Sequence, residues 1–380
     1  MVEVPPTNRS PRRQIFPHSW PRRRPGSGRP SSRSGTRRRQ LNRFPLRERK
    51  RVRHHTFSTE IKSALRGLSL LDNWHGPLAA VEDVLVIGGA ITIGTLVPAA
   101  APIAIFTIGS RMRALATLLH EASHQTLASN STLNRIIGTV AGLAIFQTFD
   151  AYRRSHVKDH HIYTGNLDQD PDLKFHVQNG LYDGQSPQMF FWNHIVKPGL
   201  ALNAGKTLKY LIRDRLLGVF RNDASEEGRR DAWIFVGFWS AIAATLTATG
   251  LWVPFLVWWL LPYVTTFQIV NYFCELGEHF PKPAGTDLDI DMSRNRVGNA
   301  LERFFFGMHN EHLHLEHHLA PGIPFWNLLK AREARLRDST YAALDAQAGG
   351  LFTRGPNGAA SIISQIMMWV AKTAAPEEGA

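Results

Sequence analysis

Residues 232–274, AWIFVGFWSAIAATLTATGLWVPFLVWWLLPYVTTFQIVNYFC, form a run of 43 residues without a charged side chain. At about 1.5 Å per helical residue the run would reach roughly 64 Å, close to two crossings of a hydrocarbon core about 30 Å thick. Thr249, Gly250 and Pro254 stand near its middle, where the chain would turn back. The run therefore predicts two membrane helices, over 232–249 and 251–274, paired as a hairpin.

A second uncharged run covers 84–110, 27 residues that would be about 40 Å long as one helix. Pro98 and Pro102 bracket a turn, and the charged residues beyond both ends can lie at the membrane interface. The Arg-rich N-terminus is expected on the cytoplasmic side, and a single crossing would place the histidines that follow this run on the opposite side. We therefore predict a second hairpin, with spans at about 79–97 and 98–118.

Outside the hairpins the sequence indicates shorter surface helices. Residues 131–149 are apolar but short and contain Arg135, and residues 186–220 mix aromatic and leucine residues with lysines and arginines. The predicted fold is an all-α integral membrane protein, with four transmembrane helices in two hairpins and a helical, His-rich cytoplasmic cap. The membrane domain covers 56–340, residues 341–380 form a C-terminal cytoplasmic tail or helix, and both termini are cytoplasmic.

Residues 1–55 are predicted to be a disordered, Arg-rich tail. Residues 1–53 hold 16 Arg and one Lys against two Glu, a balance of +15, so the remaining chain is near −2 when the whole carries +13. Such a segment buries too little apolar surface to order itself. It could bind anionic lipid or nucleic acid by charge. We instead expect a solvated, topology-setting tail or an over-extended reading frame, and no nucleic-acid partner.

Three clusters of histidines lie close to the uncharged runs: HEASH (120–124), HVKDHH (156–161) and HLEHH (314–318). Histidines three or four residues apart share one helix face, so each cluster can present several imidazoles to one point. One such pair is common by accident, but three clusters on the same predicted side of the membrane indicate metal ligation. The candidate ligands are His120, His124, His156, His160, His161, His314, His317 and His318.

Further candidates flank these clusters. A helical wheel places Asn310 on the same stripe as the three histidines of the last cluster. His279, at the cytoplasmic end of the last span, could add a ligand from beneath the site. Asp168 and Asp170 could accept the second N–H of ligand imidazoles, although a solvated turn is the alternative. The other histidines that we assign are His75, His176 and His194 to the core, and His18, His54 and His55 to the tail.

Ligand type alone does not select the metal, because imidazoles suit zinc, copper, iron and nickel. Catalytic zinc generally uses three protein ligands, so eight or nine imidazoles on separate segments indicate a binuclear centre. Cys274 is the single cysteine, which excludes an intrachain disulfide and a Cys-based metal site. A redox metal beside the membrane points to oxygen chemistry on a lipid-like substrate.

The three histidine motifs, followed by LAPGIP (319–324), resemble those of the membrane fatty acid desaturase and hydroxylase superfamily over roughly residues 75–335. The resemblance implies a cytoplasmic di-iron centre that activates O2. In it the eight cluster histidines bind two Fe ions, His279 is a ninth ligand and Asn310 holds an iron-bound water. No fused cytochrome b5 motif (HPGG) is present. The resemblance therefore implies a separate electron donor, of ferredoxin, rubredoxin or cytochrome b5 type, with its reductase.

The expected function is O2-dependent desaturation of a fatty acyl or similar lipid chain, held in an apolar tunnel between the hairpins with 304–306 and 325–326 near its mouth. The alternative on the same centre is a hydroxylase or ketolase of an alkyl, carotenoid or natural-product substrate. A metal transporter or sensor is a third class. It is disfavoured because neither hairpin carries a charged residue or histidine at mid-span, where a transport pathway would need one.

Overall fold

The computed structural model describes residues 53–374, apart from 221–223, 283–285 and 287. Residues 1–52 of the predicted tail lie outside this range. The tail's last residues contact the folded chain: His54 Nδ1 lies 2.9 Å from Asp289 Oδ2, and His55 Nε2 lies 3.2 Å from Asp338 Oδ1. The His54 side chain is nevertheless 81% exposed, as a solvated residue would be, whereas that of His55 is 16% exposed, so the assignment of His55 to a solvated tail is wrong.

Four helical segments are long and apolar enough to cross a membrane. They are α3 (His75–Leu96); α4 (Ala101–His124), preceded by the 3₁₀ turn η2 (Pro98–Ala100); α12 (Glu226–Thr249); and the series α13 (Trp252–Phe255), η7 (Leu256–Leu260), α14 (Leu261–Val264) and α15 (Thr266–His279). Their outer faces expose large apolar side chains such as Leu96, Val84 and Trp233, of which 75%, 65% and 76% is accessible. Such faces suit lipid rather than water, and the chain is a membrane protein.

All other regular elements of the described residues are short helices, and the chain's one β contact there is a single bridge between Arg53 and Leu288. Those before α12 are α2 (Thr59–Leu68), α5 (Ser131–Ala144), α6 (Phe149–Arg153), the π-helical turn η3 (Arg154–His160), α7 (His161–Tyr163), α8 (Pro171–Gln178), α9 (Pro187–Phe191), η4 (Trp192–Val196), α10 (Lys197–Gly199), α11 (Ala204–Tyr210), η5 (Leu211–Leu216) and η6 (Leu217–Phe220). Those after α15 are η8 (Asp289–Asp291), α16 (Ala300–Phe306), η9 (Met308–Asn310), α17 (His314–Leu319), η10 (Phe325–Asn327), α18 (Leu328–Arg335), α19 (Ser339–Asp345) and α20 (Ile362–Ala374).

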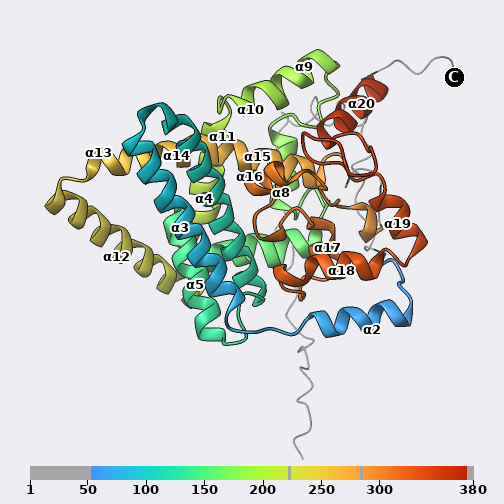
Figure 1. The fold of residues 1–380 in the computed structure, drawn as a ribbon, viewed down its shortest axis with the longest axis horizontal. Coiled ribbons are helices and arrows are strands. Elements are labelled where there is room, and N and C mark those ends of the chain that lie inside the picture. The colour runs from blue at the N-terminus through green and yellow to red at the C-terminus, as the bar shows by residue number, and fades with distance from the viewer. Residues whose placement is uncertain (1–52, 221–223, 283–285, 287, 375–380) are drawn as a thin grey trace, which may run out of the picture. The chain divides into compact units, whose positions relative to one another are not determined.

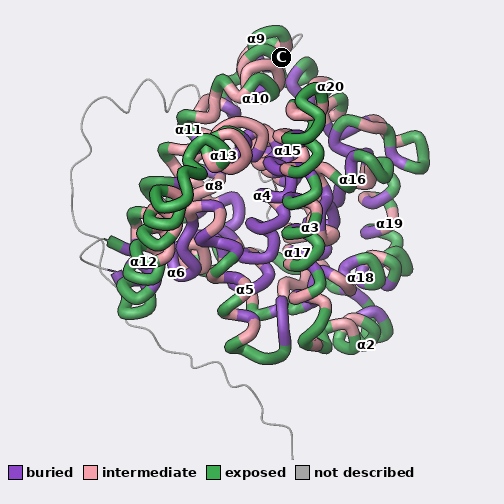
Figure 2. The backbone as a smooth tube through the Cα atoms, turned by 60° about the vertical axis from the view of Figure 1, so that its left-hand side comes forward, coloured by how far each residue is buried: buried purple, intermediate pink, exposed green. Residues whose placement is uncertain are grey.

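Helix α4 is the central element of the fold. It packs against α3, α5 and α15, while α12 stands at one edge and the elements from α16 onward gather on the other side of α4 (Figure 1). Figure 2 shows the same contrast in burial, with α4 buried and α12 largely exposed. The core along α4 contains Ile108, Met112, Leu118 and Leu119, none of them accessible to solvent. This packing fixes the end of α4, where the first histidine cluster lies.

Gly109 allows α4 and α15 to approach closely. A Cβ at this position would meet Thr266 Oγ1 and would lie 2.6 Å from the backbone nitrogen of Phe267. Gly109→Ala is therefore expected to destabilise the protein by about 1–3 kcal/mol through overpacking, measured as a lower unfolding temperature in detergent. The control is Gly88→Ala in α3, where nothing lies within 4 Å and helix propensity favours alanine. Equal unfolding temperatures for the two variants would contradict this account of the contact.

Candidate metal centre

Nine histidines from four separate segments converge beside α4. Five offer ligand nitrogens that all lie within 4.8 Å of one another: His120, His124, His156, His161 and His317. A second set, His160, His279 and His318, meets the same limit, and His314 joins His279 in a third with Glu278. The chain thus forms two adjoining imidazole clusters, which we call site A (the five) and site B (His160, His279, His314 and His318).

The first motif occupies the last turn of α4. His120 and His124 lie one above the other with ring centroids 4.9 Å apart, as their spacing predicts. The helix stops at Gln125, which adopts a left-handed conformation (φ 63°) and turns its N–H back to the carbonyls of Glu121 and Ala122. Because α4 is held by packing on three sides, the two rings are fixed on a rigid support.

The second motif lies in a π-helical turn, not in the α-helix that the spacing predicts. In η3 the residues five apart align, so His156 Nε2 and His161 Nε2 lie 3.0 Å apart and belong to site A. His160 is thereby directed to site B, where its ring centroid lies 5.2 Å from that of His318. The wider turn is what divides one hexapeptide between two clusters.

The third motif starts a new helix at its first ligand histidine, because α17 begins at His314. His309 and Asn310 have positive φ angles of 50° and 58° and belong to the separate turn η9. The helical wheel assumed one continuous helix from Asn310 to His318, and this assumption is wrong for the residues before His314. Asn310 donates from Nδ2 to the carbonyl oxygen of Phe325 at 3.0 Å. Its proposed role toward a metal-bound water remains a prediction.

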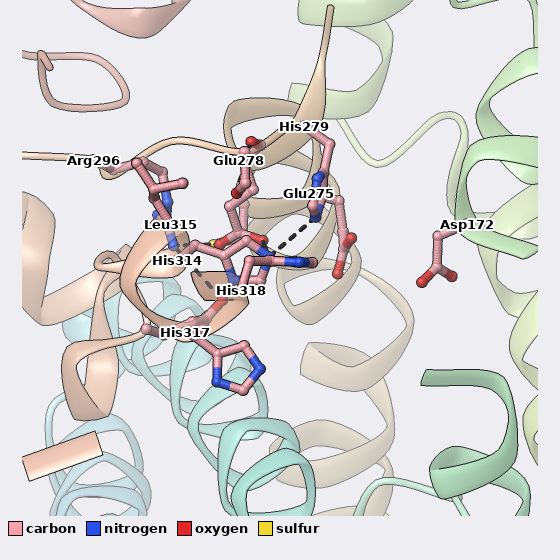
Figure 3. Close-up of polar contacts among 12 residues, drawn as sticks. Asp172, Glu275, Glu278, His279, Arg296, His314, Leu315, His317 and His318 are labelled. Atoms are coloured by element: carbon pink, nitrogen blue, oxygen red, sulfur yellow. Dashed lines mark hydrogen bonds and ion pairs between the residues drawn. The ribbon is translucent and has the colours of Figure 1, made fainter. Parts of the chain in front are cut away.

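His279 ends α15 and faces the third motif (Figure 3). Its Nε2 lies 3.0 Å from His314 Nε2, and His318 Nε2 lies 3.0 Å from the same atom. The membrane helix thus brings a nitrogen to site B, as a ninth ligand requires.

The arrangement of the imidazole nitrogens suits metal ligation better than hydrogen bonding among the histidines. His161 Nε2 faces both His156 Nε2 and His317 Nε2 at 3.0 Å, although a neutral imidazole has a single N–H to donate, and His120 Nε2, His124 Nε2 and His317 Nδ1 are buried without a hydrogen-bond partner among the described residues. Burial, with neighbouring imidazoles, holds the pKa values of His156, His161, His314, His317 and His318 well below the usual range. Neutral, convergent imidazoles are the donor set of zinc, copper, iron and nickel.

Asp170 orients His160. Its Oδ1 lies 3.0 Å from His160 Nδ1 and also caps α8, accepting from the backbone nitrogens of Asp172 and Leu173. Burial opposes the imidazolium, but attraction to Asp170 outweighs it and raises the pKa of His160 to about 9. This carboxylate leaves Nε2 for a metal ion. Asp168 lies in a loop, where its N–H donates to Asn166 Oδ1, and no contact with an imidazole is described for it.

Asp170→Asn is expected to lower metal affinity 10- to 100-fold, because the amide keeps the helix cap but loses the charge that polarises His160. The measurement is metal retained per chain against a graded chelator. Asp168→Asn is the matched control and should leave retention unchanged. Equal retention by the two variants would contradict an orienting role for Asp170.

A buried ionic network behind α17 was not predicted from the sequence. Arg335 Nη1 and Tyr341 Oη donate to the two oxygens of Glu316, and Asn295 Nδ2 donates to Tyr341 Oη at 2.9 Å. Asn295 Oδ1 in turn accepts from the backbone nitrogen of Leu315 at 3.1 Å. The network therefore fixes the helix that carries three ligands, on the face opposite the imidazoles.

A cavity of about 80 Å³ adjoins the imidazoles. Apart from ligand histidines, its lining combines apolar side chains with the charged or polar residues Arg113, Glu275, Asn271, Gln147 and Tyr272. The aromatic segments 304–306 and 325–326 do not line it. This cavity is therefore not the predicted apolar tunnel, because charged side chains of α4 and α15 face the space beside the ligands, and the tunnel remains a prediction.

The histidines assigned to the core fall in different places. His75 stacks on Trp326 with ring centroids 4.6 Å apart, and His194 Nε2 lies 2.9 Å from Gln185 Nε2, both away from the clusters. His176 instead lines the cavity. Neither His75 nor His194 shares a ligand group with another histidine among the described residues.

Comparisons with known proteins agree with this geometry. The model of the fatty acid desaturase family matches residues 96–346. Dihydrorhizobitoxine desaturase of Bradyrhizobium elkanii is 41% identical over 314 residues, 82% of this chain and 89% of that protein. The sn-1 acyl-lipid omega-3 desaturase (ferredoxin) of a Nostoc strain is 22% identical over 67% of this chain and 72% of its own length. Beta-carotene 4-ketolase of Protosiphon botryoides is 26% identical over 61% and 51%.

The matched region contains all nine clustered histidines, both long helices that carry ligands and the cavity between them. The family match, the relative at 41% identity and the four apolar helices all point to the same class of membrane oxidoreductase. The chain therefore belongs to the fatty acid desaturase family.

Proposed function

We propose that this protein is an O2-dependent di-iron desaturase. The observation that carries the proposal is the convergence of nine imidazoles into two adjoining clusters beside a cavity. Overall, the reaction removes two hydrogens from adjacent carbons and reduces O2 to two waters, consuming two further electrons and two protons. When bound, two iron ions would supply the activation of O2 that attack on an unactivated CH2 group requires.

The chain's own residues hold and shield the centre. His120, His124, His156, His161 and His317 would hold one iron, and His160, His279, His314 and His318 the other. Asp170 keeps the His160 proton on Nδ1 and so directs Nε2 inward. The Glu316 network fixes α17, and the buried surroundings limit the access of bulk water.

The orientation of the protein in the membrane can be inferred from the distribution of its positive charges. We propose that α3 with α4, and α12 with α13–α15, cross the membrane as two hairpins, with the histidines and both termini on the cytoplasmic side as the positive-inside tendency indicates. Electrons would come from a separate carrier of ferredoxin, rubredoxin or cytochrome b5 type. One relative, whose name specifies ferredoxin, supports the first of these.

A ketolase or hydroxylase is the second candidate, favoured by the similarity to a beta-carotene 4-ketolase. Product mass separates the two reactions. Purified protein in nanodiscs, loaded with iron and supplied with O2 and a reducing system, would be incubated with metabolite extracts from a host that lacks the gene. A product two mass units lighter than its precursor supports desaturation. A gain of sixteen, as the main product, would contradict it.

A further inference from the structure

The cavity beside the metal centre has two unlike walls. One is made by ligand histidines, among them His120, His156 and His279. The other is formed by α4, α15, α8 and α11 together with Glu311, which follows η9, and it carries Arg113, Glu275, Glu311 and Asp172. A substrate that reaches the metals must therefore lie against charged groups.

Apart from histidines, the only cationic side chain of this wall among the described residues is Arg113, and it already has hydrogen-bond partners. Arg113 donates from Nε and Nη2 to Glu311 Oε1 at 2.8 and 2.5 Å, and from Nη1 to Asn271 Oδ1 at 2.5 Å. Its Nη1 also lies 3.1 Å from Glu275 Oε1. Glu311 and Glu275 thus face Arg113, whereas Asp172 Oδ1 accepts from Tyr210 Oη at 2.7 Å and its Oδ2 lies 3.6 Å from His160 Nδ1. The wall therefore sets three carboxylates against one guanidinium.

Glu275 is the carboxylate best placed for a ligand. It stands one turn before His279 on α15, and 27% of its side chain is accessible. Figure 3 shows Glu275 and Asp172 on the same side of His279, away from His317. Neither hydrogen bond nor ion pair is described between Glu275 and a ligand imidazole, so its charge is directed to Arg113 and to the cavity.

A long acyl chain suits this space poorly. An apolar chain laid along Glu275, Asp172 and Arg113 would desolvate charged groups and return no hydrogen bond to them. The cavity's 80 Å³ has room for on the order of six water-sized groups, whereas pockets for larger ligands reach about 300–1,000 Å³. The size of this inner cavity and its charged side chains therefore favour a short group that can hydrogen-bond to them.

A second hollow, of about 480 Å³, adjoins the first and has the opposite charge. Lys174, Lys206 and Lys209 line it, and Phe175 and Tyr210 line both hollows with ring centroids 4.9 Å apart. For these three lysines the described residues include no carboxylate partner. Rings this close are in contact and form a wall shared by the two hollows. A ligand that extends past this wall would have one end among lysines and the other among carboxylates.

We infer that the substrate of this protein is a short amphoteric molecule, with a cationic amine held by Glu275 and Asp172 beside the metals and an anionic group held by the lysines of the outer hollow. The inference rests on the proposed function and specifies its substrate class. Glu275 then acts as a binding residue that places the reacting carbons near sites A and B.

Binding of simple probes tests this without turnover. Iron-loaded protein in nanodiscs would be titrated calorimetrically with straight-chain amines, carboxylates and ω-amino carboxylates of four to eight carbons, and with oleate. At least one ω-amino carboxylate should bind ten times more tightly than the amine or carboxylate of equal length. Glu275→Gln should weaken its binding about tenfold and leave the carboxylates unchanged, whereas Lys209→Gln should weaken only probes that carry a carboxylate.

The glutamine in Glu275→Gln keeps an oxygen for Arg113, and the unfolding temperature and iron content of each variant verify its fold. Glu82→Gln is the matched control, since Glu82 also lies near a buried arginine of α4, Arg111, at 3.6 Å, but outside both hollows. If Glu275→Gln fails to fold, Asp172→Asn replaces it and should weaken binding of the ω-amino carboxylate to the same extent.

Tighter binding of oleate than of every short probe, or equal binding by Glu275→Gln and the parent, would overturn the inference. Probe binding as expected, but no O2-dependent product from the metabolite extracts, would contradict the proposed function instead.

Discussion

Replacing His161 with alanine is expected to reduce turnover at least about a hundredfold and to lower bound iron below two ions per chain. His161 Nε2 lies 3.0 Å from both His156 Nε2 and His317 Nε2 in site A, and its ring stacks on His318 of site B with centroids 4.5 Å apart. Loss of this imidazole removes a ligand from one cluster and a packing partner from the other. Mutation of a residue that only orients a ligand already lowers metal affinity or activity about 10- to 100-fold.

The control for His161→Ala is His194→Ala, a buried histidine bonded to Gln185 and Tyr272 and away from both clusters. That variant should keep its iron even if its unfolding temperature falls. Iron would be counted by mass spectrometry, and product formation followed in parallel. Full iron and full activity in His161→Ala would show that His161 is not a ligand.

Replacing Arg335 with methionine should have the largest effect on stability, about 3–5 kcal/mol, because it leaves a carboxylate buried without its cation. Arg335 and Glu316 are 1% and 0% accessible, and Tyr341 Oη and Asn295 complete the network. Burial raises the pKa of Glu316 even with Arg335 present. Removal of the guanidinium is therefore expected to unfold α17 at lower temperature and to release iron with it.

Arg337→Met is the matched control two residues away. Arg337 pairs with Glu60 at 3.0 Å, but the two side chains are 61% and 78% accessible, and an exposed pair contributes about 0–1 kcal/mol. Unfolding temperatures of the two variants in the same detergent give the comparison. A fall for Arg337→Met as large as that for Arg335→Met would contradict the role assigned to the buried network.

The membrane helices and the histidine motifs could be predicted because their signals are local. An uncharged run has a length that can be compared with the bilayer, and histidines at helical spacing share a face. The observed α3, α12 and the series α13–α15 lie close to the predicted spans, and α4 runs six residues beyond its span, to His124. His120 and His124 need nothing beyond the α-helix that contains them.

The remaining features depend on contacts that sequence spacing does not encode. Whether residues 154–160 form an α or a π turn changes which histidines align, yet both turns fit the same hexapeptide. The sequence does not distinguish Asp168 from Asp170. In the structure only Asp170 caps α8 and contacts His160. The charged cavity joins side chains from distant segments, so an apolar tunnel was the simpler expectation for an enzyme in lipid.

The central claim is that imidazoles of this chain hold two iron ions beside the membrane. The most direct measurement is iron and zinc per chain, with Mössbauer spectra, on protein purified from cells grown in ⁵⁷Fe. We predict two iron ions per chain and the spectrum of a nitrogen-ligated iron pair, which disappears in His161→Ala. An active preparation that contains one zinc ion and no iron would contradict the account.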